Sequence, residues 1–96
     1  MVITLDIVAD AIKVVENSQR HPYGVMVRCH DPRKVCKDTI AYNYHCWRNE
    51  GCKGNFYDYL SKNYCPPNAK RWSKLVQQKI LNEVVQQRHK RSAIRL

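Results

Sequence analysis

The clearest structural signal in the sequence lies in residues 36–65, CKDTIAYNYHCWRNEGCKGNFYDYLSKNYC. It begins and ends with cysteine and holds two more cysteines in between. The dipeptide Asp31-Pro32 just before it is a favourable helix start, so we expect one helix over about residues 32–47. A turn follows at residues 48–51, and Asn55 can cap a second helix that runs to about residue 64. The stretch therefore predicts a helical hairpin with cysteines at both of its ends.

The cysteines of this hairpin allow two interpretations, a zinc site or disulfide bonds. Structural zinc sites usually take ligands from Cys-x2-Cys or Cys-x4-Cys turns, and the sequence has neither spacing. The turn of a hairpin would bring Cys46 near Cys52, and its open end would bring Cys36 near Cys65. A small chain gains stability from such cross-links because its core is limited. We therefore favour the disulfides Cys36–Cys65 and Cys46–Cys52, with Cys29 as a free thiol and no metal.

The hairpin also resembles a known family. A Cys-x9-Cys helix, a turn and a second cysteine-flanked helix resemble the twin Cys-x9-Cys (coiled-coil–helix–coiled-coil–helix) proteins of mitochondria. Within this group, Cys65-Pro66 followed by Trp72 is similar to the Cys-Pro…Trp stretch of the cytochrome c oxidase subunit VIb family. Cys46-Trp47 followed by a basic residue is similar to the small mitoribosomal member of the group. The resemblance covers about residues 35–72.

The resemblance implies where the protein works and what it does. Members of the family lack a cleavable presequence and are oxidised in the mitochondrial intermembrane space, so we expect a protein peripheral to the inner membrane. Its expected role is that of a non-catalytic accessory subunit of a respiratory-chain complex, with cytochrome c oxidase as the first candidate. The alternative is a mitoribosomal protein whose basic C-terminal arm contacts rRNA.

Residues 1–31, before the hairpin, predict an amphipathic helix and a connector. Apolar residues recur at three- and four-residue spacing over about residues 4–18, and Thr4 can cap this helix. Charged residues interrupt the apolar stretch, so we expect neither a secretory signal nor a membrane span. Breakers such as Gly24 mark residues 19–31 as a connector. The face expected to be buried consists of Leu5, Val8, Ala9, Ile12 and Val15.

Residues 68–96, after the hairpin, predict a basic helical arm with its helix over about residues 69–90. The chain has 17 Lys and Arg against 8 Asp and Glu, a net charge of +9. Residues 70–96 hold eight of the basic residues and a single acidic one, Glu83. We expect the arm to lie against a protein or RNA outside the hairpin core, with lipid headgroups or plain solvation as alternatives. The partner-binding residues expected are Trp72, Leu75, Val76, Ile80, Lys70, Arg71, Lys74 and Arg88.

These patterns predict an all-α chain with three parts: residues 1–31, 32–67 and 68–96. A length of 96 residues leaves no room for a multi-domain enzyme. The sequence has no P-loop, dinucleotide fingerprint or Cys-x-x-Cys redox motif. We therefore expect no catalytic residues and no cofactor. The aromatic residues around the hairpin are more typical of helix packing than of base stacking.

Overall fold

The computed structural model describes residues 3–64 and 66–94, and every regular element within them is helical. This confirms the all-α class for that part of the chain. Four α-helices account for most of it, and two short 3₁₀ turns lie between them. The helices are α1 (Leu5–Glu16), α2 (Pro32–Asn49), α3 (Phe56–Ser61) and α4 (Ala69–Ile94), and the 3₁₀ turns are Pro22–Gly24 and Pro66–Asn68.

The first three helices begin at the capping residues that the sequence predicts. The Thr4 hydroxyl accepts a backbone N–H from the first turn of α1 at 3.2 Å. The Asp31 carboxylate does the same for α2 at 3.1 Å, and the Asn55 side chain does so for α3 at 2.7 Å. The first N–H groups of a helix have no partner within it, so each cap satisfies a donor that would otherwise be unpaired.

Helix α3 is shorter than expected. It ends at Ser61 because residues 62–64 turn back on it through 3₁₀-type bonds, such as the one from the Tyr64 N–H to the Ser61 carbonyl at 3.0 Å. The turn brings the Tyr64 hydroxyl to 3.5 Å from the Cys36 sulfur near the start of α2. The chain therefore does return along α2 after the turn, as a hairpin requires, although its second helix is brief.

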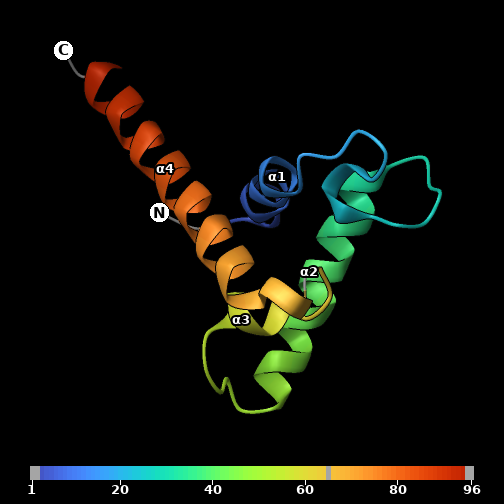
Figure 1. The fold of residues 1–96 in the computed structure, drawn as a ribbon. Coiled ribbons are helices and arrows are strands. Elements are labelled where there is room, and N and C mark those ends of the chain that lie inside the picture. Colours follow the sequence, from blue (N-terminus) through green and yellow to red (C-terminus); the bar gives the residue numbers. More distant parts are fainter. Residues whose placement is uncertain (1–2, 65, 95–96) are drawn as a thin grey trace.

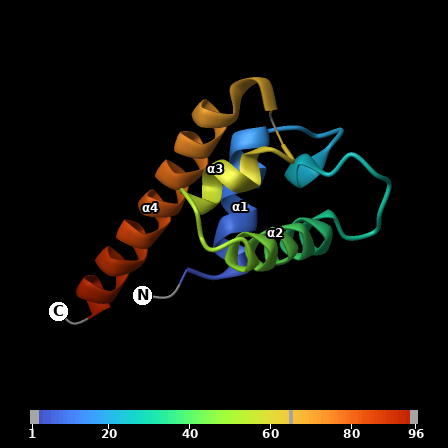
Figure 2. The ribbon, with the colours of Figure 1, turned by 90° about the horizontal axis from the view of Figure 1, so that it is seen from below.

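Helix α1 occupies the middle of the fold. It packs against α2 on one side and α4 on the other, while α3 packs against both α4 and α2. Figure 2 shows α1 between the two longer helices, and Figure 1 shows the far end of α4 extending beyond the other elements. The shared core consists of Val8, Ala9, Ala11, Ile12, Cys36, Ile40, Leu60, Trp72, Val76 and Ile80.

The position of α4 corrects one prediction. Its apolar stripe was expected to lie against a partner, outside the hairpin core, but Trp72, Val76 and Ile80 are all buried inside this chain. The reason is that α1 exposes an apolar face too wide for α2 alone, and the stripe of α4 covers the rest of it. The first part of α4 is therefore a core helix and not a detached arm.

An ionic contact that the sequence did not reveal ties α1 to α2. The Arg33 guanidinium donates to both carboxylate oxygens of Asp10, at 3.1 and 2.9 Å. Lys37, one turn further along α2, lies 2.9 Å from the Asp6 carboxylate, one turn earlier on α1. This contact lowers the pKa of Asp6. The pairs fix the register of the two helices at the surface, above the apolar core.

Candidate functional site

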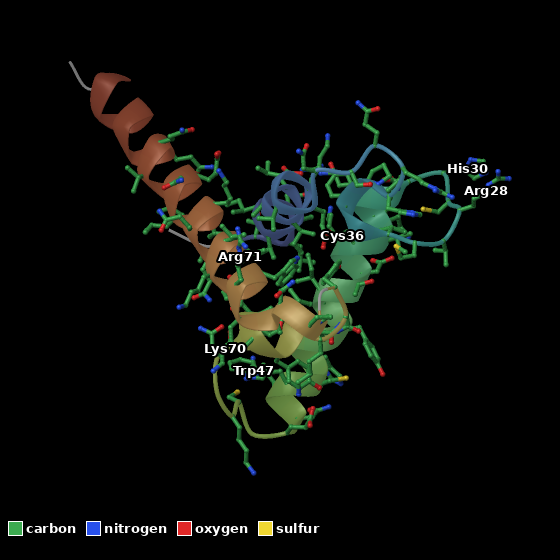
Figure 3. The ribbon with its side chains drawn as sticks, in the orientation of Figure 1. Arg28, His30, Cys36, Trp47, Lys70 and Arg71 are labelled. Atoms are coloured by element: carbon green, nitrogen blue, oxygen red, sulfur yellow. The ribbon has the colours of Figure 1, made fainter. Side chains whose placement is uncertain are left out.

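The outer face of α4 is the best candidate for contact with a partner. Lys70, Lys74, Leu81 and Val85 follow one another at intervals of four, seven and four residues, so they share one side of the helix. All four residues are exposed, and Arg71 is exposed beside them. Figure 3 labels Lys70 and Arg71 near the start of α4. We call these five residues the outer face of α4; it combines positive charge with uncovered aliphatic surface.

The predicted partner-binding residues thus divide into two groups. Lys70, Arg71 and Lys74 are exposed, and Leu75 is 43% exposed, so these four remain available. The buried residues of the stripe are not available, as described above, and the expectation that they bind a partner is wrong for this structure. The side chain of Arg88 lies outside the described residues. The sequence pattern places Leu81 and Val85 at the margin of the apolar face of this helix, whereas the structure leaves both exposed.

Trp72 is held by a polar and aromatic cluster inside the fold. Its indole N–H donates to the Glu16 carboxylate at the end of α1 at 3.0 Å. Its ring stacks on Tyr64 with the centroids 4.9 Å apart and the planes within 10° of parallel. The Tyr64 hydroxyl in turn meets the Cys36 thiol, and burial raises the pKa of both groups. Because this cluster joins α1, α2 and α4, its role here is structural.

The cysteines lie in different environments. Cys36 is buried, Cys46 is half-buried, and Cys29 and Cys52 are exposed. No disulfide joins any of these four described cysteines, so the Cys46–Cys52 link is not formed in this structure. Cys65, the predicted partner of Cys36, lies outside the described residues. Both pairings stay predictions, which peptide mass mapping of the unreduced protein would test.

The aromatic residues at the far end of the hairpin pack on one another. Phe56 contacts Tyr44 edge-on at a centroid distance of 5.4 Å, and it lies 5.6 Å from Trp47. The Trp47 N–H donates to the carbonyl of Lys53 at 3.2 Å, which closes the turn between α2 and α3. These rings pack against one another, as expected for helix packing.

Neither a metal site nor a membrane span emerges from the described part of the chain. Within residues 3–64 and 66–94, no three His, Cys, Asp or Glu side chains gather closely enough to hold a metal ion. No described helix is both long enough and apolar enough to cross a bilayer.

Comparisons with protein-family models, with curated proteins and with solved structures found no match. Evidence on function therefore comes from the surfaces and the cysteine pattern of the chain itself.

Proposed function

We propose that this chain is a non-catalytic accessory subunit of a larger mitochondrial assembly and that it docks through the outer face of α4. The observation that carries the proposal is the composition of that face. Lysines and uncovered aliphatic side chains share one side of a long helix whose opposite side is anchored in the core. A helix presented in this way can bury its outer face on a neighbour without any rearrangement of the fold.

A respiratory-chain complex is the first candidate assembly, with cytochrome c oxidase ahead of the others. Support comes from the Cys-x9-Cys spacing of Cys36 and Cys46 in a cysteine-flanked hairpin, which resembles the twin Cys-x9-Cys group. Further support comes from the Cys-Pro…Trp stretch that ends at Trp72, which resembles the subunit VIb family within that group. A protein of this kind would lie in the intermembrane space, peripheral to the inner membrane, and would need neither a cofactor nor a catalytic residue.

A mitoribosomal location is the second candidate, and one structural observation favours it. The core takes up Trp72, Val76 and Ile80, so much of the apolar stripe that could have bound a protein partner is already used. What remains outside is richer in positive charge, and lysine and arginine side chains of this kind bind RNA phosphates.

Fractionation of mitochondria separates the two candidates. An epitope-tagged full chain should sediment with respiratory-chain activities and remain with them after mitoribosomes are dissociated. The variant Lys70→Gln/Lys74→Gln should weaken this association, whereas Lys53→Gln/Lys62→Gln removes the same charge from a different exposed surface and should leave it intact. Sedimentation with the ribosomal subunits would instead establish the second candidate.

Salt dependence gives an independent measurement. Contacts with RNA phosphates lose affinity with a logarithmic slope of about −0.7 to −0.9 for each phosphate neutralised. Contacts made by Leu81 and Val85 should change little with salt. Association with neither assembly, in mitochondria that contain the tagged chain, would refute the proposal.

A further inference from the structure

The connector between α1 and α2 forms a half-open pocket that the sequence did not suggest. Ten residues between positions 20 and 32 line a cavity of about 820 Å³, within the size range of ligand sites. Two arginines and two histidines contribute to the lining, and no carboxylate does. The remaining lining residues are aliphatic apart from Cys29. The basic residues are Arg20, His21, Arg28 and His30, and the others are Pro22, Val25, Met26, Val27 and Pro32.

The aliphatic part of this loop is left in water. Met26 is 73% exposed, more than any other large hydrophobic residue among those described, and Val27 is 67% exposed. Exposing two adjacent large aliphatic side chains is unfavourable in water, and such exposure commonly marks a contact surface. The next residue is Arg28. Figure 3 shows Arg28 and His30 together at the outer edge of the loop, pointing away from the body of the protein.

Both ends of the loop are held by contacts with the rest of the chain. Tyr23 and Gly24 both have positive φ values, 59° and 69°, which turn the chain sharply outward. The Gly24 N–H donates to the His21 carbonyl at 2.9 Å. Gly24 also lies so close to Tyr64 that an added Cβ would approach that ring to 2.9 Å. On the other side, Asp31 caps α2 and ends the loop.

We propose that this loop docks on the surface of an anionic phospholipid bilayer. Met26 and Val27 would enter the boundary between headgroups and acyl chains, while Arg20 and Arg28 bind lipid phosphates around them. An aliphatic tip with a basic collar is the arrangement that binds such an interface by combined apolar burial and charge attraction. The inference concerns a different surface from the outer face of α4 and does not depend on the proposed function.

The choice of lipid over nucleic acid follows from the side chains present. Proteins that hold single-stranded nucleic acid stack its bases on aromatic rings. The pocket lining contains no Phe, Tyr or Trp, and the nearby Tyr23 packs against the core. Methionine and valine offer bases no flat ring, whereas both partition readily into the acyl region of a membrane.

Vesicle co-sedimentation of the full chain tests the proposal. The protein should bind vesicles of phosphatidylcholine with phosphatidylserine and bind phosphatidylcholine alone far more weakly. Arg20→Gln/Arg28→Gln should lower the affinity for the mixed vesicles about 25-fold, since each arginine near an anionic surface contributes about a factor of five. Met26→Ser/Val27→Ser should lower it roughly tenfold, because partial burial of the two side chains is lost.

Two matched variants show whether the loop itself is responsible. Lys70→Gln/Lys74→Gln removes the same charge from α4, and Leu81→Ser/Val85→Ser removes exposed aliphatic surface from that helix. Apart from the small effect of a lower net charge, both variants should change the affinity for vesicles by less than about twofold. Far-UV circular dichroism should confirm that all variants keep the helical fold.

Three results would overturn the proposal. Equal affinity for charged and neutral vesicles would show that Arg20 and Arg28 do not bind lipid phosphates. Loss of binding in the α4 variants, with the loop variants unaffected, would move the contact to α4. Binding of single-stranded RNA that depends on Arg20 and Arg28, without vesicle binding, would identify nucleic acid as the ligand of the pocket.

Discussion

Replacing Trp72 with alanine should destabilise the whole fold, and the structure allows the effect to be estimated. The side chain is only 4% exposed, stacks on Tyr64 and donates a hydrogen bond to Glu16. Truncating a buried tryptophan costs about 3–5 kcal/mol, and the Glu16 carboxylate also loses its partner. A chain of 96 residues has a total free energy of unfolding of about 5–14 kcal/mol. We therefore expect Trp72→Ala to lose about 4 kcal/mol, between a third and most of the stability.

Urea denaturation of the reduced protein, followed by far-UV circular dichroism, measures this loss. Two further variants divide it into its causes. Trp72→Phe keeps a ring that can stack but has no donor for Glu16. The lost hydrogen bond should cost about 1–1.5 kcal/mol, in addition to the cost of replacing the indole with a smaller ring. Leu75→Ala is the exposed neighbour on the same helix and should cost less than about 1 kcal/mol.

The interpretation depends on the contrast between the two positions. If Trp72→Ala stays within about 1 kcal/mol of the wild type, or matches Leu75→Ala, then α4 does not belong to the core and the packing described here is wrong. Removal of residues 69–96 should likewise uncover Val8 and Ile12 and abolish cooperative unfolding, because α4 covers the side of α1 that α2 does not reach.

Three other predictions concern local features. Gly24→Ala should lower the free energy of unfolding by about 1–2 kcal/mol, measured in urea, because its φ is positive and the new Cβ would press on Tyr64; unchanged stability would contradict this conformation. Arg33→Gln should cost less than about 1 kcal/mol in the same assay despite its bidentate bond, because the pair is largely solvated, and a loss above about 2 kcal/mol would show a contact stronger than the structure indicates. In the reduced protein, iodoacetamide should modify Cys52 rapidly and Cys36 only on unfolding, because burial both shields the Cys36 thiol and raises its pKa; equal rates by peptide mass spectrometry would refute its burial.

Local signals in the sequence predicted most of the helices well. The capping residues Thr4, Asp31 and Asn55 act through bonds to residues two or three positions away, so their effect can be read without knowing the fold. The end of α3 was less predictable. Tyr64 continues the apolar pattern of that helix, but its ring stacks on Trp72, which lies on another helix. A turn at residues 62–64 accompanies this contact.

The candidate sites were harder to predict, for a physical reason. An amphipathic stripe shows that a helix buries one face, but the same stripe fits a contact within the chain or with a partner. Val76 and Ile80 therefore looked like interface residues until α1 was placed against them. The turn beside the loop pocket has positive φ values at Tyr23 and Gly24, and only the glycine indicates such a turn in the sequence.

The bond between Glu16 and Trp72 spans 56 residues, and this separation has a consequence for synthesis. The apolar face of α1 leaves the ribosome well before α4, the helix that completes its cover. Until α4 is made, the nascent chain has no full core and stays open to chaperones. Closing so long a loop also slows folding, because the chain loses conformational entropy before the stabilising contact forms. The newly made chain therefore lacks its complete core until α4 has been synthesised.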